Sequence, residues 1–268
     1  MESTPETLLR SGICSQQQLE SKEFQDWAEL LGEYRNHLHR KIWEWCFVAQ
    51  ALFERGLLES GKSGLGFAVG QEPLSALFCS LGASICATDL FPDVAKQRGW
   101  VESNQHASSL ESMNSRGICD RNLFRQRCSL QFADMNHIPD DLREFEFVWS
   151  SCALEHLGSL EHGFAFVRNA MDCLKRGGVA VHTTDFNLSS NDATLCEGET
   201  VFYRRRDIEK LAKNLRTDGF SIDVDWSVGT MPADLNVDTQ PLTHNPHLRV
   251  EIGQFTVTSM GFIVSKPA

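Results

Sequence analysis

Beyond Gly64 the chain consists of short apolar runs that alternate with amphipathic stretches, and this pattern constrains the fold more than any other feature. Each run is too short for a helix and is bounded by turn residues. The alternation predicts a doubly wound α/β structure, a mostly parallel sheet with helices on both faces, because consecutive parallel strands need a crossover between them. The expected strands are 65–69, 84–88, 130–133, 145–151 and 179–184. The expected helices are 73–82, 159–174 and 206–215, with a turn at 175–178.

The two ends of the chain show different patterns. Residues 1–62 are expected to be helical, since Phe24, Trp27 and Leu31 recur at helical spacing. We expect this segment to be a helical cap on one α/β unit, residues 63–268, because nothing marks a second independent core. The apolar runs 220–226 and 255–265 are separated by a proline-containing loop instead of a helix. They are therefore expected to pair antiparallel at one edge of the sheet.

Composition and charge exclude several classes of protein. The 268 residues are 41% hydrophobic and 23% charged, as in a compact folded chain. A formal net charge of −11 argues against nucleic acid or anionic lipid as a partner, because such binding needs clustered Lys and Arg. No apolar run of about 18 residues and no signal-peptide pattern occur, so we expect a cytoplasmic protein without a transmembrane segment. The nine cysteines include no Cys-x-x-Cys pair and are expected to be buried free thiols.

Carboxylates follow two neighbouring strands at the points where a ligand is expected. In an open α/β sheet, ligands bind beyond the carboxyl ends of the strands. Asp89 lies 19 residues after Gly70, where a carboxylate can accept hydrogen bonds from both ribose hydroxyls. Asp134 ends the next strand and is placed for an adenine amino group. No triple-glycine pyrophosphate loop is present, so a nucleoside without a diphosphate fits better than a dinucleotide, although each residue alone is also an ordinary turn former.

With these residues, the chain resembles the class I S-adenosylmethionine-dependent methyltransferases. The resemblance rests on residues 64–70, 87–90, 132–135, 145–157 and 174–181. It implies a Rossmann-like fold with a seven-stranded sheet and an antiparallel last strand, and S-adenosyl-L-methionine as cofactor. The cofactor-binding residues expected from it are Ala68, Gly70, Glu72, Asp89, Leu90, Asp134, Met135 and Ser151.

The loop after the first strand departs from the family pattern. The family usually has an acidic residue in the first strand and a Gly-x-Gly-x-Gly loop after it. Here Gly66 stands at the acidic position, Ala68 at the first glycine and Glu72 at the third. Either Glu72 contacts the amino group of the cofactor, or the loop binds through backbone amides alone. The altered loop also leaves open a protein that keeps the fold without catalysis.

Three residues after the fourth and fifth strands are candidate general bases for a hydroxyl acceptor. They are His156, His182 and Asp185, with Glu155 less favoured. His156 follows the fourth strand where the methyl group is expected to emerge, and its alternative role is to begin the next helix. His182 lies within an apolar run, so a hydrogen-bonded core histidine is equally consistent, and Asp185 is alternatively a loop cap. A base adds a typical 10²–10⁴-fold to such a reaction.

Acceptor recognition and metal binding give weaker signals. Arg35, Arg40, Lys41 and the run 204–206 are candidates to recognise an acidic acceptor, or else belong to a solvated helix face. The segment 43–45, Trp-Glu-Trp, is a candidate cover for the cofactor or the acceptor, with at least one tryptophan in the core. The pairs at 37/39 and 156/162 are histidines without further ligands, so no metal site is expected and transfer should not depend on a divalent metal.

The function expected from these features is O-methylation of a small-molecule or glycan acceptor, in enzyme class EC 2.1.1. Residues 183–191 and 202–207 are similar to bacterial methyltransferases associated with surface-polysaccharide synthesis. A non-catalytic partner or regulatory protein of the same fold is the main alternative. An NAD-type oxidoreductase shares Asp89 but should carry a glycine-rich pyrophosphate loop, which Ala68 and Glu72 interrupt.

Overall fold

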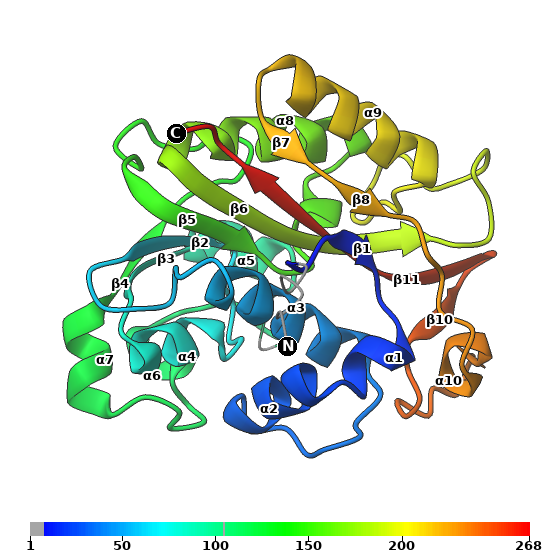
Figure 1. Ribbon diagram of the computed structural model, residues 1–268, viewed down its shortest axis with the longest axis horizontal. Coiled ribbons are helices and arrows are strands. Elements are labelled where there is room, and N and C mark those ends of the chain that lie inside the picture. Colours follow the sequence, from blue (N-terminus) through cyan, green and yellow to red (C-terminus); the bar gives the residue numbers. More distant parts are fainter. Residues whose placement is uncertain (1–7, 104) are drawn as a thin grey trace, which may run out of the picture.

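The computed structural model describes residues 8–103 and 105–268, which form one α/β molecule around an eleven-stranded sheet (Figure 1). The strands are β1 (Ser11–Ile13), β2 (Ser63–Phe67), β3 (Ser84–Asp89), β4 (Cys128–Phe132), β5 (Phe145–Ser150), β6 (Leu174–Asn187), β7 (Ser221–Ile222), β8 (Val224–Asp225), β9 (Val237–Asp238), β10 (Arg249–Ile252) and β11 (Phe255–Ser265). The helices are α1 (Gln16–Leu19), α2 (Lys22–Leu30), α3 (Arg40–Phe53), α4 (Leu74–Leu81), α5 (Pro92–Gln97), α6 (Leu110–Met113), α7 (Arg121–Arg127), α8 (Leu160–Ala170), α9 (Arg205–Thr217) and α10 (Pro232–Leu235), with 3₁₀ turns η1 (Leu154–His156) and η2 (Met171–Cys173).

The predicted parallel sheet is confirmed. Its strand order is β4-β3-β2-β5-β6-β11-β1-β8, and the pairs from β4 to β6 are all parallel. The last strand, β11, runs antiparallel to β6, as the sequence predicts. The strand expected at 220–226 is divided into β7, which pairs antiparallel with β11, and β8, which pairs with β1.

Two sequence expectations about the sheet are wrong. The count of seven strands is too low, because β1, β8, β9 and β10 add short pieces from the chain ends. The turn expected at 175–178 lies inside β6, where the pairing with β5 shifts register and Gly177 has φ +75°. A bulge of this kind keeps the strand continuous and bends it locally.

Residues 11–13 are a strand, although the sequence predicts helix for the whole first segment. Gly12 faces Gly261 of β11, and the Ser11 hydroxyl accepts the N–H of Ile263 at 2.9 Å. A three-residue strand is too short to show a period of two, so local pattern cannot reveal it. The N-terminal segment is therefore part of the sheet as well as a helical layer upon it.

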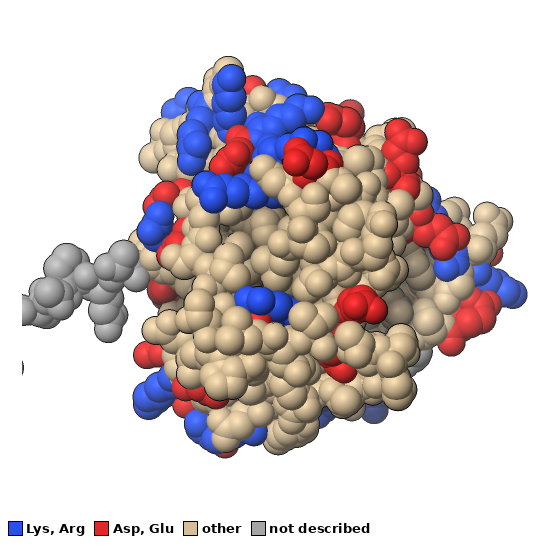
Figure 2. Space-filling view, turned by 90° about the vertical axis from the view of Figure 1, so that its right-hand side faces the viewer, with Lys and Arg blue, Asp and Glu red and all other residues tan. Residues whose placement is uncertain are grey.

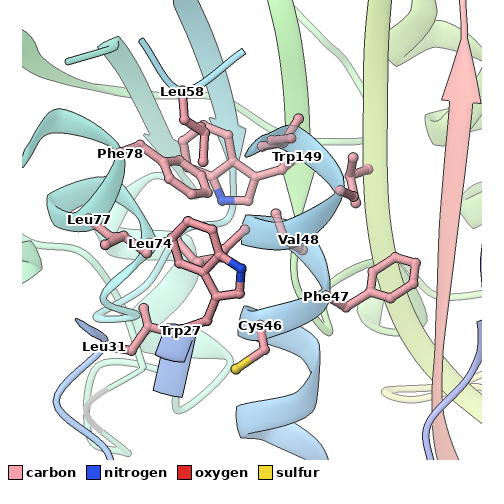
Figure 3. Packing of buried hydrophobic residues seen from close by; sticks show 14 of the residues in the cluster. Trp27, Leu31, Cys46, Phe47, Val48, Leu58, Leu74, Leu77, Phe78 and Trp149 are labelled. Atoms are coloured by element: carbon pink, nitrogen blue, oxygen red, sulfur yellow. The ribbon is translucent and has the colours of Figure 1, made fainter. Parts of the chain in front are cut away.

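Helices cover both faces of the sheet. In Figure 1, α8 and α9 lie on one side and α2, α3, α4, α6 and α7 on the other. Figure 3 shows Trp149 and Phe78 side by side in the second layer, with Phe47 of α3 pointing toward β6 and β11. The rings of Phe78 and Trp149 are in edge contact, with centroids 5.2 Å apart. Aromatic packing of this kind holds α4 on the sheet.

Glycines in the strands make room for these rings. A Cβ at Gly64 would overlap Phe147, one at Gly66 would overlap Trp149, and one at Gly261 would overlap Phe47. Gly66 stands where the methyltransferase family that the sequence resembles has an acidic residue. In this structure the indole of Trp149 occupies the space next to Gly66. Among residues 8–103 and 105–268, no helix is both long and apolar enough to cross a membrane.

Candidate active site

A cavity lies at the carboxyl ends of β2, β3, β4 and β5, where the strand pattern places a ligand. It encloses about 600 Å³ of empty space, including the part that opens to solvent. The residues that line it are Ala68, Asp89, Leu90, Arg98, Trp100, Gln105, Ala133, Asp134, Met135, Asn136, Cys152, Ala153, His156 and Leu157.

Asp89 is the buried carboxylate of this cavity. Its Oδ2 accepts the N–H of Gly70 at 3.1 Å and that of Ala107 at 2.8 Å, and its Oδ1 accepts the N–H of Leu90 at 2.7 Å. Burial raises the pKa of Asp89, and these hydrogen bonds act in the opposite direction. A carboxylate offers about four lone-pair positions, so one remains on Oδ1 for a ligand hydroxyl. If both ribose hydroxyls bound to Asp89, as expected from the sequence, one of its three hydrogen bonds from backbone N–H groups would have to break.

The loop after β2 keeps a glycine-like backbone despite its altered sequence. Ala68 has φ +49° and Gly70 has φ +53°, both in the left-handed region. Ala68, which stands at a family glycine, thus has the conformation that glycine adopts without strain. A Cβ at Gly70 would overlap the carbonyl oxygen of Gln105, so the loop packs closely against the backbone of Gln105.

Asp134 and Met135 line the cavity beside Asp89, as predicted for residues that end successive strands. The Asp134 carboxylate accepts the N–H of Asn136 at 2.9 Å and lies 3.3 Å from Nδ1 of His137. Asp134 therefore stabilises a turn and also faces the cavity, so its roles as a turn former and as a candidate adenine contact are compatible. Met135 is buried and supplies apolar surface.

Three of the expected cofactor residues are not in the cavity lining. Gly70 donates its backbone N–H to the Asp89 carboxylate. Glu72 accepts the indole N–H of Trp149 at 3.1 Å, and burial raises the pKa of Glu72 to about 8. Ser151 donates to Glu44 at 3.3 Å, on the side of α3.

His156 lines the cavity from η1 and is held in one tautomer. Its Nδ1 lies 2.9 Å from the carbonyl oxygen of Glu199, which can only accept a hydrogen bond. Nδ1 therefore carries the proton, and Nε2 keeps a lone pair. The ring also meets Trp100 edge-on, with centroids 6.0 Å apart.

The other candidate bases lie deeper. His182 is fully buried, shares a hydrogen bond of 2.8 Å with Ser150, and packs against Phe166. Burial lowers the pKa of His182 to about 3, so the ring is neutral. Asp185 forms an ion pair with Arg40. Neither side chain lines the cavity.

Beside the cavity, α3 carries a buried network of charges. Glu44 is fully buried and accepts from Thr183 at 2.7 Å and Ser259 at 2.5 Å. Burial disfavours its charge, but Lys41 and Arg40 outweigh this and hold the pKa of Glu44 below its usual value. The network joins α3 to β6 and β11 and thereby fixes the N-terminal layer against the site.

Glu155 lies near this network and is also fully buried. Thr184 donates to its Oε2 at 3.0 Å, while Oε1 has no partner. Burial, together with the charge of Asp185, raises the pKa of Glu155. Cys152, Glu155 and Asp185 place ligand atoms within 4.8 Å of one another. Arg40 already occupies Asp185, and burial raises the pKa of the Cys152 thiol well above its usual value, so this group is poorly suited to a metal.

Most other basic candidates are in ion pairs away from the cavity. Arg35 pairs with Glu29 at 2.6 Å, and Arg204 is buried against Asp207 at 2.6 Å. Figure 2 shows Lys and Arg gathered over α9, with a largely uncharged surface below. Of the Trp-Glu-Trp segment, Trp43 is fully buried, which confirms that one tryptophan belongs to the core. All nine cysteines are free, as expected, but only six are buried: Cys86 and Cys152 are half-buried and Cys196 is exposed.

Arg98, Trp100 and Gln105 form the part of the cavity wall that the sequence did not reveal. They belong to a stretch without helical or strand periodicity, which the sequence pattern marks only as a connection between elements. Trp100, a large aromatic residue within that connection, was the one available signal.

Comparison with known proteins supports the fold. No protein-family model and no curated protein matches the sequence. Among solved structures, the chain is similar to a protein assigned as a sarcosine dimethylglycine methyltransferase from Galdieria sulphuraria, with a TM-score of 0.52, 16% identity, and coverage of 92% of this chain and 99% of that one. It is also similar to magnesium protoporphyrin IX methyltransferase from Synechocystis PCC 6803 with bound SAH, with a TM-score of 0.51, 12% identity, and coverage of 93% and 97%.

A third similar structure is the glycopeptide N-methyltransferase MtfA, with a TM-score of 0.50, 13% identity, and coverage of 84% of this chain and 90% of that one. Identities this low are informative about the fold alone. The expected Rossmann-like methyltransferase fold is therefore confirmed, with the larger sheet described above.

Proposed function

We propose that this chain is an S-adenosylmethionine-dependent methyltransferase of class EC 2.1.1 that methylates a hydroxyl group of a polar small molecule. The observation that carries the proposal is the position of His156. Its Nε2 lone pair is free, and the residue lines the same cavity as the carboxylates of Asp89 and Asp134. A nucleoside-binding edge and a proton acceptor thus share one cavity.

The residues present suit this cofactor. Asp89 retains one acceptor position for a ribose hydroxyl, and the Asp134 carboxylate is available for an adenine amino group. Leu90, Met135 and Leu157 supply apolar surface for the adenine ring. When bound, S-adenosylmethionine supplies a methyl group already activated on a sulfonium.

The protein's task is then to position the acceptor and receive its proton. Correct positioning alone can lower a barrier by ~7–11 kcal/mol. The Nδ1–H bond to the Glu199 carbonyl orients the ring of His156, so that Nε2 can take the hydroxyl proton as the new bond forms. His182 and Asp185 are less suited, because one is enclosed in the core and the other is paired with Arg40.

A glycan hydroxyl is one acceptor of this class. The similarity of residues 183–191 and 202–207 to enzymes of surface-polysaccharide synthesis is the basis for it, together with an expected cytoplasmic location. Within residues 202–207, however, the arginines serve ion pairs of the fold. We therefore give the general class, a hydroxylated polar molecule, precedence over the glycan.

The test has two stages. Calorimetry with S-adenosylmethionine, SAH and NAD should show binding of the first two and none of the third. A panel of hydroxyl and amine acceptors with isotope-labelled S-adenosylmethionine then identifies the product. His156→Ala should lower kcat by roughly 10²-fold with little change in cofactor affinity. Normal turnover in this variant would remove His156 from the reaction.

One observation favours a second candidate, a non-catalytic protein that keeps the methyltransferase fold. Three backbone N–H groups already occupy Asp89, and the Gln105 carbonyl packs against Gly70. In such a protein, Asp89 would serve as an internal clamp for the loop. Absence of binding to both S-adenosylmethionine and SAH would favour this candidate over the enzyme.

A further inference from the structure

Three histidines that are far apart in the sequence meet beside the start of α3. His39 is the N-cap residue of α3, and His244 and His247 lie in the loop between β9 and β10. A parallel β-bridge joins His39 and His247. One ring nitrogen of each histidine lies within 4.8 Å of the others. None of the three lines the cavity described above.

We propose that these imidazoles bind one divalent transition-metal cation of the zinc class. Imidazole nitrogens suit zinc, nickel and copper, whereas magnesium and calcium prefer oxygen ligands. A zinc–nitrogen bond of about 2.1 Å puts each ring centre roughly 3.2 Å from the metal, so two ligand rings lie at most about 6.5 Å apart. The three centroid distances are 4.5, 5.2 and 6.3 Å, all within that limit. The rings of His39 and His247 are stacked at an interplanar angle of 20°, so one of them must rotate before both in-plane lone pairs meet the cation.

Asp238 supports the site as a carboxylate behind a metal ligand. It is buried, and its Oδ2 accepts the Nδ1–H of His247 at 2.6 Å, which leaves Nε2 of that ring with a lone pair for a cation. A carboxylate that accepts from a ligating histidine is a common feature of zinc sites. Asp238 also accepts the N–H groups of Thr243 and His244, both at 2.9 Å, so one carboxylate positions the whole loop.

His39 has a competing role. Its Nδ1 accepts the N–H of Lys41 at 3.1 Å and so caps α3. A cation bound at Nδ1 displaces this cap, and a cation bound at Nε2 requires the ring proton to move to Nδ1. Metal binding and helix capping therefore compete for the Nδ1 lone pair of His39. A substitution at position 39 that caps the helix but does not bind the metal tests the two roles separately.

The site would connect the start of α3 to the loop between β9 and β10. The next residue, Arg40, donates its N–H to the His247 carbonyl at 3.0 Å and pairs with Asp185. A cation here would fix the first turn of α3, whose side chains lie against the candidate active site. Three histidines leave one of the four zinc positions open for a water molecule.

The experiment is a Zn²⁺ titration of metal-free protein without a histidine tag, in competition with a chromophoric chelator. Wild-type protein should bind one equivalent, and Zn²⁺ should raise the thermal unfolding midpoint while Mg²⁺ leaves it unchanged. His39→Asn and His244→Asn should each weaken binding at least about tenfold. Asparagine caps helices well and tolerates left-handed backbone, as needed at His244 with φ +61°.

His162→Asn is the matched control, because His162 is exposed on α8 and outside the cluster. It should bind Zn²⁺ as the wild-type protein does. Stoichiometric binding that survives both His39→Asn and His244→Asn would place the cation elsewhere, for example at the exposed Cys196 thiol, and would overturn the proposal. Absence of stoichiometric binding to the wild type would overturn it too. The readouts do not involve methyl transfer, so they are independent of the proposed function.

Discussion

Two small residues of the loop after β2 have left-handed backbone, but only one of them needs to be glycine. Ala68, with φ +49°, carries a strain of roughly 1–2 kcal/mol that glycine would relieve, whereas glycine costs about 0.4–1 kcal/mol through the unfolded chain. Ala68→Gly should therefore raise the free energy of unfolding by up to about 1 kcal/mol. Gly70→Ala should lower it, because its Cβ would overlap the Gln105 carbonyl. Urea unfolding measures both, and a destabilised Ala68→Gly would show that the methyl group packs favourably.

His182 is a residue of the core, in contrast to His156. His182→Ala removes a fully buried ring and leaves the Ser150 hydroxyl without its partner. We expect a loss of about 2–4 kcal/mol in the free energy of unfolding, as for other large-to-small core changes. His156→Ala, at a partly exposed position, should change it by less than about 1 kcal/mol. Equal stability of the two variants would contradict this distinction.

Among the helices, α3 depends most on buried charge. Glu44→Gln would leave Lys41 without its anion and Arg40 with Asp185 alone, although the side chain keeps its shape. Breaking a buried pair from one side typically costs 3–5 kcal/mol, and we expect a loss of about this size. Glu29→Gln, which breaks the exposed pair with Arg35, is the control and should cost less than about 1 kcal/mol. Chemical denaturation distinguishes them, and similar values would mean that the network contributes little.

For the whole molecule, the buried His182 and the half-buried Glu72 give the free energy of unfolding opposite dependences on pH. His182 has its pKa lowered to about 3, so the unfolded chain binds more protons below pH 6.5, and stability is lost as the pH falls from there. Glu72 has its pKa raised to about 8, so the folded chain holds a proton that the unfolded chain releases near pH 4.5, and stability is lost as the pH rises toward 8.

Across the interval from pH 6.5 to 8 the effect of Glu72 exceeds that of His182, because the imidazole of the unfolded chain is only half protonated at pH 6.5 and loses its remaining charge early in the interval. The contribution of Glu72 should lower the free energy of unfolding by at most about 2 kcal/mol across this interval. Glu72→Gln should flatten the decline, as measured by urea unfolding at several pH values. A variant with the same slope as the wild type would mean that Glu72 is ionised in the folded protein at neutral pH.

The parallel strands β2 to β6 and the antiparallel β11 were predictable from sequence pattern alone. So was one edge of the cavity. Asp89, Asp134 and His156 were found because strand periodicity is a local signal, and because the carboxyl ends of parallel strands converge whatever the rest of the chain does. The helix between Pro73 and Gly82 could be predicted as well, because a proline marks its start and a glycine marks its end.

The remaining features depend on contacts between residues that are distant in the sequence. They are β1, the cavity wall at Arg98, Trp100 and Gln105, the pair of Arg40 with Asp185, and the contact of His39 with His247. Local patterns report which face of an element is buried, but not which partner covers it. The same limit explains why His182 looked like a candidate base: its burial and its hydrogen bond to Ser150 arise from packing between neighbouring strands and α8, which no local period encodes.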